Sequence, residues 1–297
     1  MLLSGSTRTH RSVASAGARP AVLAATARRV RVVGDYIHGF GSVEEQRLWD
    51  QADVLEVAVF DHLPLVERGR LLELGCGVGA ELAHVHRRRP GLELLGVELS
   101  PTHVAAARRR VGDVARVVQA DAARLPLPDQ SVDQALTIWV LEHVPDPAAV
   151  VAEALRVLRP GGTLVCTEVD NATFAFHPEL PAVATWWDRF NRVQSDGGGD
   201  PFVGRRLSAL ARDAGAEVLE VRDIAVVATH EEPGRRDVLI DYISQLLASG
   251  ARAMTEAGAV DAAELAALEA DLDLARRDPT VGWEYHAVQM TCRPGRT

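Results

Sequence analysis

Three alternate glycines, Gly75, Gly77 and Gly79, form the segment of this chain best suited to bind a ligand. They follow a short apolar run at 70–74, which predicts a buried strand, and precede a helical pattern at 80–89. Glycine has no Cβ, so the backbone can turn sharply and a ligand can come close to it. The free N–H groups and the positive dipole end of the helix face the same place. The spacing therefore predicts a ligand-binding loop between a strand and a helix.

An acidic residue, Glu98, follows the glycine loop at about the distance that nucleotide-binding sites use. It ends a second apolar run at 92–97, so its carboxylate is expected at the end of a second strand. A carboxylate there suits a ribose, because it accepts hydrogen bonds from both hydroxyl groups. On spacing alone, a nucleotide-binding dehydrogenase fits the glycines nearly as well. The structural alternative for Glu98 is a surface carboxylate that caps Ser100 and Pro101.

The residues in and around the loop narrow these alternatives. The stretch Glu73–Gly79, read ELGCGVG, resembles the first motif of class I S-adenosylmethionine (SAM) methyltransferases, E/D-x-G-x-G-x-G. It differs from the dehydrogenase pattern G-x-G-x-x-G. Four further stretches agree with that family in the same order: Glu98, Asp121-Ala122, WVLEHVPDP at 139–147 and RVLRPGGTLV at 156–165. The resemblance is close over 71–166 and more diffuse outside it.

The resemblance implies an enzyme whose cofactor is SAM, with S-adenosyl-L-homocysteine as the product. The glycine loop would approach the methionine and ribose parts, Glu98 would bind the ribose hydroxyls, and Asp121 would accept a hydrogen bond from the adenine amino group. The residues assigned to the cofactor in this way are Tyr36, Glu73, Gly75, Cys76, Gly77, Gly79, Glu98, Leu99, Asp121, Ala122 and Trp139. The alternative role for Asp121 is a helix cap.

The acceptor substrate is expected to contact a second set of residues, namely His38, His143, Phe174, Phe176 and Trp186. His143 is the weak candidate for a catalytic residue, because methyl transfer from a sulfonium needs mainly alignment and no general base is obligatory. One alternative is that His143 and Glu142 only brace their loop. For the aromatic rings, core packing is the alternative to lining an apolar pocket.

Strand and helix patterns alternate along the middle of the chain. Segments 70–74, 92–97, 115–119, 132–139 and 163–168 read as strands, and 80–89, 101–112 and 147–158 as helices. Such alternation predicts an α/β fold with a mostly parallel sheet and helices on both faces. Ligands bind at the carboxyl ends of parallel strands, where Glu73, Glu98, Asp121 and Trp139 fall. By resemblance the sheet is Rossmann-like, and its last strand, at 285–292, is antiparallel.

The N-terminal part of the chain divides into a tail and a lid. Residues 1–34 contain arginines and no acidic residue. They are expected to form a disordered tail, although their composition also resembles a transit peptide. Residues 35–69 carry a helical pattern at 43–60 that would form a helical lid over the cofactor. Ser42 and Glu45 have the spacing of a capping box at its start.

The remaining residues divide into a core and an insertion. The core, which would bind SAM, is expected to occupy 70–230 and 280–297. Residues 231–279 are too long for a hairpin loop and show helical periodicity, with the capping-box pair Asp261 and Glu264. This helical insertion before the last strand either caps the site or forms an oligomer contact.

Composition limits the function further. The 297-residue chain has a net charge of −9 and no lysine, so nucleic acid is not expected as a partner. No run approaches the length of a membrane span. The three cysteines lack metal-ligand spacing, and no cluster of histidines and carboxylates predicts a metal site. We therefore expect a cytoplasmic protein that takes a small-molecule substrate, with a homo-oligomer as one option.

These features together predict SAM-dependent methyl transfer to an oxygen, nitrogen or activated carbon of a metabolite or natural product. The motifs are most similar to those of the ubiquinone/menaquinone-type methyltransferases, a group with many substrates. Two alternatives remain. One is an enzyme of the same fold that uses SAM in a cyclisation-type reaction, and the other is a non-catalytic SAM-binding protein.

Overall fold

A computed structural model of the protein describes residues 36–295. The tail expected at 1–34 thus lies outside the described residues. Contacts along the chain group residues 34–297 into one compact unit. Between residues 36 and 295, none of the helices combines the length and the apolar composition needed to cross a membrane.

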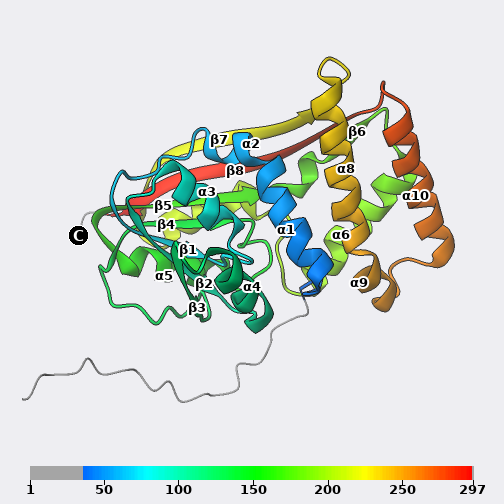
Figure 1. The fold of residues 1–297 in the computed structure, drawn as a ribbon. Helices are drawn as coiled ribbons and strands as arrows, with labels where there is room; N and C mark the ends of the chain where they lie inside the picture. The colour runs from blue at the N-terminus through cyan, green and yellow to red at the C-terminus, as the bar shows by residue number, and fades with distance from the viewer. Residues whose placement is uncertain (1–35, 296–297) are drawn as a thin grey trace, which may run out of the picture. The chain divides into compact units, whose positions relative to one another are not determined.

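The described residues form an eight-stranded sheet in the order β3-β2-β1-β4-β5-β8-β6, and β7 pairs with β8 (Figure 1). The strands are β1 (Gly69–Leu74), β2 (Leu92–Glu98), β3 (Ala115–Gln119), β4 (Val132–Ile138), β5 (Leu158–Val169), β6 (Ala175–His177), β7 (Ala216–Ala228) and β8 (Gly282–Pro294). The first five pair in parallel, whereas β8 is antiparallel to β5, β6 and β7. The predicted mostly parallel sheet with an antiparallel last strand is confirmed.

Helices cover both faces of this sheet (Figure 1). They are α1 (Ser42–Val54), α2 (Glu56–Phe60), α3 (Ala80–Arg88), α4 (Pro101–Val111), α5 (Pro147–Val157), α6 (Pro181–Asp196), α7 (Leu207–Asp213), α8 (Pro233–Ser249), α9 (Ala251–Glu256) and α10 (Ala262–Arg277). Successive residues of β1 alternate between the faces. Leu71 packs in one hydrophobic cluster with Leu82 of α3, and Leu72 in a second cluster with Val150 of α5. Both clusters are buried, so the middle strands read as continuous apolar runs.

The start of the lid differs from the prediction in two ways. The helix expected at 43–60 is broken at Leu55 into α1 and α2. The Ser42 and Glu45 capping box is wrong, because α1 begins after Gly41 without a side-chain cap. The Glu45 carboxylate instead accepts a hydrogen bond from Arg109 on α4, at 3.2 Å. The guanidinium of Arg109 thus hydrogen-bonds the carboxylate that would otherwise accept from the backbone in a capping box.

Residues 233–277 contain the three helices α8, α9 and α10. The capping box of Asp261 and Glu264 is present at the start of α10, with both reciprocal hydrogen bonds. Helix α8 packs on α1 and β7, and α10 packs on α6 and α8. Figure 1 shows α6, α8 and α10 gathered beyond one end of the strands. The short strand β6 and the helix α9 were not predicted from the sequence.

Candidate functional site

The glycine loop lies between β1 and α3, as the sequence predicts. Gly75, Gly77 and Gly79 all have positive φ angles, of 68°, 48° and 82°. A Cβ on Gly75 would lie 2.7 Å from methyl carbons of Val140, so this glycine permits close packing on the segment after β4. A Cβ on Gly77 would have no atom within 4 Å. Gly77 is therefore the position at which a ligand can approach the backbone.

Glu98 lies at the end of β2 and is tied to the glycine loop. Its carboxylate accepts hydrogen bonds from the backbone N–H groups of Gly77, at 3.0 Å, and Ser100, at 2.7 Å. Burial raises the pKa of Glu98, while these hydrogen bonds act in the opposite direction. The next residue, Leu99, is exposed. The carboxylate and the open backbone of Gly77 therefore lie beside each other.

Two more carboxyl groups lie close to this loop. Glu73 is 2% exposed, and its Oε2 atom has no hydrogen-bond partner between residues 36 and 295. Burial raises the pKa of Glu73 well above its usual range, and the charges of Glu81 and Glu98 raise it further. Burial also raises the pKa of Glu81 to about 7. A group of carboxyls this poorly compensated suits a ligand that brings positive charge and hydrogen-bond donors.

Asp121 lies next to Glu98 across the β2–β3 pairing. The N–H of Ala120 donates to the carbonyl of Glu98, at 3.0 Å. The Asp121 side chain is exposed and accepts a hydrogen bond from the N–H of Ala123, at 2.8 Å. It therefore caps a turn, and the helix cap considered as its alternative role is not present, because no helix lies between β3 and β4. Its second carboxylate oxygen has no partner in the described part of the chain, so a ligand contact stays a prediction.

The segment after β4 is held by a buried carboxyl that the sequence did not single out. Trp139 has a φ of 57°, a conformation that few residues other than glycine adopt. Its N–H donates to the carbonyl of Thr167, at 3.0 Å. The N–H groups of Val140 and Leu141 both donate to Oε2 of the fully buried Glu168, at 3.1 and 3.0 Å. Burial, with the nearby charge of Glu142, raises the pKa of Glu168 to about 8.

This raised pKa predicts a loss of stability with rising pH. The folded pKa of Glu168 is above the unfolded one, so its contribution is complete below about pH 4.5 and is lost as pH rises towards 8. Glu168→Gln retains one oxygen for both N–H groups and cannot ionise. We expect the variant to gain about 2–4 kcal/mol relative to wild type between pH 5 and 9. Urea unfolding at several pH values measures this difference, and parallel pH curves for the two proteins would contradict it.

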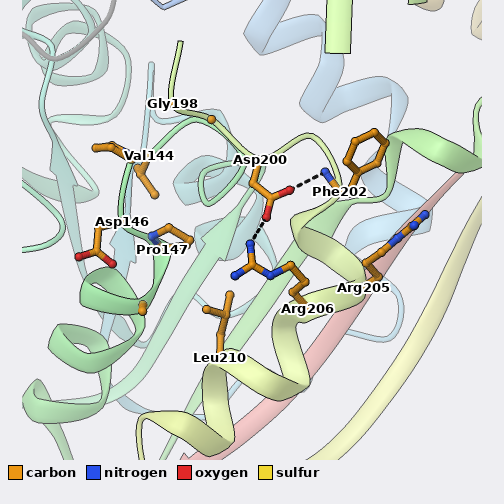
Figure 2. Close-up of a pocket in the computed structure, with 12 residues that line it drawn as sticks. Val144, Asp146, Pro147, Gly198, Asp200, Phe202, Arg205, Arg206 and Leu210 are labelled. Atoms are coloured by element: carbon orange, nitrogen blue, oxygen red, sulfur yellow. Dashed lines mark hydrogen bonds and ion pairs between the residues drawn. The ribbon is translucent and has the colours of Figure 1, made fainter. Parts of the chain in front are cut away.

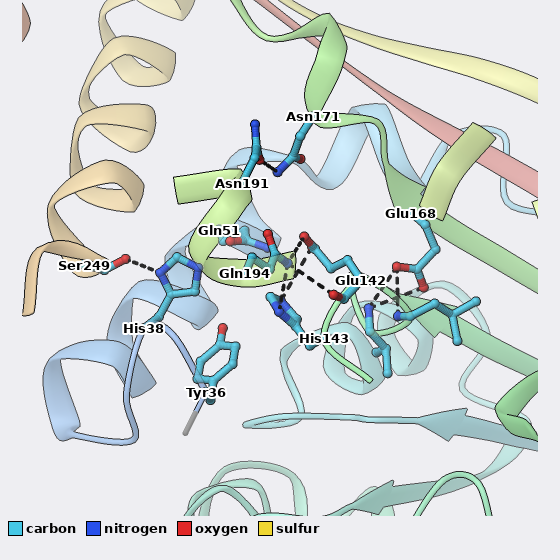
Figure 3. A network of polar contacts seen from close by, with 12 residues as sticks. Tyr36, His38, Gln51, Glu142, His143, Glu168, Asn171, Asn191, Gln194 and Ser249 are labelled. Carbon is cyan, nitrogen blue, oxygen red and sulfur yellow. Dashed lines mark hydrogen bonds and ion pairs between the residues drawn. The ribbon is translucent and has the colours of Figure 1, made fainter. Parts of the chain in front are cut away.

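Tyr36, assigned to the cofactor from the sequence, lies together with His38 and His143 of the predicted substrate side (Figure 3). The ring centroid of Tyr36 is 5.3 Å from that of His38 and 5.1 Å from that of His143. His38 and His143 are 6.3 Å apart by the same measure. The hydroxyl of Tyr36 donates to Glu44 of α1, at 3.2 Å, and burial raises its pKa. The structure therefore joins the residues before α1 to the segment after β4.

His143 is braced by residues on both sides. The Nε2 atom of Gln194, on α6, donates to Nδ1 of His143 at 3.4 Å and to Oε2 of Glu142 at 3.1 Å. Nε2 of His143 lies 3.6 Å from Oε1 of Glu142. This favours the interpretation that Glu142 and His143 support their loop. No pattern in the sequence marks Gln194, which lies about fifty residues away on a helix recognised mainly by its apolar face.

The aromatic residues are packed in the core of the described structure. Phe176 and Trp186 are 5% and 2% exposed. The ring of Phe174, which is half-buried, stacks on Trp187 at a centroid distance of 4.1 Å. Core packing, the alternative for these rings, therefore describes Phe176 and Trp186, whereas Phe174 is only partly buried. Cys76 is also buried, and its backbone N–H and carbonyl are hydrogen-bonded to Val97 and Gly79.

A surface depression of about 640 Å³ lies between the segments 144–148, 198–202 and 205–210 (Figure 2). Two arginines line it, but both are paired, Arg205 with Asp170 and Arg206 with Asp200. None of the site residues predicted from the sequence lines it. We therefore assign no function to this depression.

The strand order and the glycine loop with its acidic partners define a class I methyltransferase domain, and comparison with known proteins agrees. Residues 72–166 match the family described as a methyltransferase domain. A probable S-adenosylmethionine-dependent methyltransferase of Mycolicibacterium smegmatis is 42% identical over 114 residues, which are 37% of this chain and 42% of that protein. The trans-aconitate 2-methyltransferase of Methylobacterium nodulans is 31% identical over 172 residues, 55% of this chain and 60% of that protein.

A solved structure with the same fold is a Haloferax volcanii putative methyltransferase, in complex with the activator Trm112. It has a TM-score of 0.57 at 18% identity, covering 88% of this chain and 99% of the other. The chain spans less than half the length of the first curated relatives it matches. Residues 72–166 thus form a methyltransferase domain with the class I fold, and the relative from Mycolicibacterium smegmatis is named as S-adenosylmethionine-dependent.

Proposed function

We propose that the protein transfers the methyl group of SAM to an oxygen, nitrogen or activated carbon of a small molecule. The observation that supports this most is the open backbone of Gly77 beside the carboxylate of Glu98 and the uncompensated Glu73. When bound, SAM supplies a methyl group activated by a positively charged sulfur and also carries an ammonium group. Such a cation is what the carboxyls of Glu73, Glu81 and Glu98 lack.

Different residues of the chain would bind the parts of SAM and align the acceptor. Backbone groups of 75–79 would contact the methionine and ribose parts, Glu98 would accept from the ribose hydroxyls, and Asp121 with Ala122 would contact the adenine. Glu73 would compensate positive charge. Residues around Tyr36 and His143 would align the acceptor and exclude water, which is most of what methyl transfer requires.

We also infer that residues 231–279 cap the substrate side, in preference to forming an oligomer contact. Ser249, at the end of α8, hydrogen-bonds the ring of His38 at 2.6 Å. Tyr242 of the same helix is buried, and the charge of Arg47 on α1 acts on its hydroxyl. Helix α8 of this insertion thus packs against the segment before β1 and contacts His38, one of the residues expected to contact the acceptor.

Calorimetric titration of the purified protein with SAM and with S-adenosylhomocysteine tests the cofactor. We expect saturable binding of both. Transfer of labelled methyl from SAM to a panel of small molecules, beginning with trans-aconitate because of the relatives named above, then tests the reaction. Binding of SAM without methylation of any acceptor would favour the non-catalytic alternative. No binding to a folded protein would refute the proposal.

Glu98→Ala is expected to weaken SAM binding by about 1–3 kcal/mol, because the ribose hydroxyls and two backbone N–H groups lose their acceptor. Glu93→Ala is the matched control. Glu93 lies on the same strand, is largely exposed and pairs with Arg70, so its loss should leave the affinity unchanged. Titration of both variants with SAM measures the difference, and equal affinities would remove Glu98 from the proposed site.

A further inference from the structure

The hydrogen bonds around Ser249 determine which nitrogen of His38 carries a proton. The Ser249 hydroxyl donates its single proton to the carbonyl of Leu246, at 2.7 Å. Its oxygen therefore accepts the hydrogen bond that joins it to Nδ1 of His38, at 2.6 Å. Nδ1 must be the protonated nitrogen, and Nε2 of a neutral His38 then carries a free lone pair.

The surroundings of His38 keep this ring neutral. Burial lowers the pKa of His38 well below its usual value, and the nearby charges of Arg47 and His143 lower it further. Arg47 is itself paired with Glu44 on α1, and His143 lies beside Glu142 after β4. The ring of Tyr36 lies 5.3 Å from that of His38, and its hydroxyl donates to the same Glu44. Since no carboxylate among residues 36–295 hydrogen-bonds the ring, the lone pair of His38 stays available at neutral pH.

The position of His38 suits contact with an acceptor substrate. Its ring lies among Tyr36, His143 and Phe190, and it is half-buried (Figure 3). Nε2 has no hydrogen-bond partner among residues 36–295, whereas both ring nitrogens of His143 face other side chains. Oε1 of Gln194, beside His143, is buried and also lacks a partner there. An unpartnered base and an unpartnered buried acceptor both fit a ligand group that brings a proton donor.

We propose that His38 is the general base of the reaction, that Ser249 is its positioning residue, and that the acceptor is a hydroxyl or an amine. The proposal rests on the proposed function. The acceptor oxygen or nitrogen forms a bond to the methyl carbon, and the bond from that carbon to sulfur breaks with its electron pair left on sulfur. The acceptor proton moves to Nε2, and the resulting imidazolium returns it to water. A carboxylate acceptor needs no such base, because it has already lost its proton.

NMR of the protein labelled with ¹⁵N-histidine tests the proton positions without any acceptor. His38→Asn assigns the signals of the ring. We expect a neutral His38 with a bare Nε2 at pH 7, both with and without S-adenosylhomocysteine. Ser249→Ala should remove the preference for this tautomer. Ser244→Ala is the matched control, since Ser244 is on the same helix and its hydroxyl also donates to a backbone carbonyl. A charged His38, or one protonated at Nε2, overturns the proposal.

Methylation of phenol and of trans-aconitate from labelled SAM tests the chemistry. His38→Asn keeps a donor for Ser249 and cannot take a proton. With phenol we expect kcat to fall about 10²-fold or more, with little change in KM and loss of the acid limb of the pH profile. The kcat of His38→Asn with trans-aconitate should change by no more than about 3-fold. The kcat of Ser249→Ala with phenol should lie between those of His38→Asn and wild type.

The outcomes separate this proposal from the proposed function. Wild-type kcat and pH profile with phenol in His38→Asn overturn the role of His38 and leave the methyltransferase function intact. The same holds if the wild type methylates trans-aconitate and not phenol. A wild-type protein that fails to bind SAM defeats both proposals. If neither acceptor is methylated although SAM binds, the NMR result decides alone.

Discussion

Arg236→Ala is expected to lower the free energy of unfolding by about 3–5 kcal/mol, as breaking a buried charged network does. Arg236 lies on α8 and is 2% exposed. Its guanidinium donates to the backbone carbonyls of Val281, Ala275 and Asp278 and pairs with Asp237. It therefore satisfies the carbonyl end of α10 and joins that helix to α8 and the start of β8. Without it, three carbonyl groups lose their donor.

Urea unfolding followed by circular dichroism measures this loss. Arg276→Ala is the matched control, because Arg276 lies on α10, is exposed and pairs with acidic side chains on the surface. Its removal should cost less than about 1 kcal/mol. Equal losses for the two variants would show that Arg236 does not hold the insertion. Helix α8 also carries Ser249, which hydrogen-bonds His38. If the ring of His38 becomes less ordered in Arg236→Ala in the absence of SAM, the stability of the insertion is connected to the substrate side.

The sequence was sufficient to predict the parallel strands and the glycine loop, because there the local sequence pattern agrees with the pairing of the strands. Strands such as β1 and β3 are short apolar runs between glycines and helical segments, and their ends were predicted within one residue. Parallel pairing then brings Glu73, Glu98 and Asp121 to one edge of the sheet without further information. For the same reason the glycine loop could be located from spacing and residue type.

The parts that were missed depend on contacts between distant residues. The bond between His38 and Ser249 joins positions 211 residues apart; His38 was predicted on the substrate side, but no local pattern marks Ser249. Glu168 reads as the polar end of a strand, but its role is to accept N–H groups from a segment 27 and 28 residues earlier. The capping box at Ser42 was wrong for a similar reason, because Arg109 of α4 competes for Glu45. The roles of the polar residues thus depend on tertiary contacts, whereas the positions of the apolar residues follow from sequence periodicity.

The glycine loop allows stability and cofactor binding to be separated. Gly75→Ala puts an alanine in a left-handed backbone conformation and its Cβ against Val140. We therefore expect it to lower the free energy of unfolding by about 2–5 kcal/mol, from backbone strain and overpacking. Gly77→Ala has a similar φ but open space around its Cβ, so about 1–2 kcal/mol is expected from strain alone. The two variants therefore have a similar loss of stability from backbone strain and differ in the loss from overpacking.

Binding of SAM should be sensitive to Gly77→Ala in spite of its smaller effect on stability. A methyl group at the open position would occupy the space through which the ligand approaches, and an overpacked contact costs about 1–3 kcal/mol, or 5- to 150-fold in affinity. Urea unfolding and calorimetric titration with SAM on both variants measure the two quantities. Wild-type affinity in Gly77→Ala would mean that the ligand does not approach the loop there. A loss of affinity in a folded Gly77→Ala would identify the backbone of this glycine, rather than the stability of the loop, as what the cofactor requires.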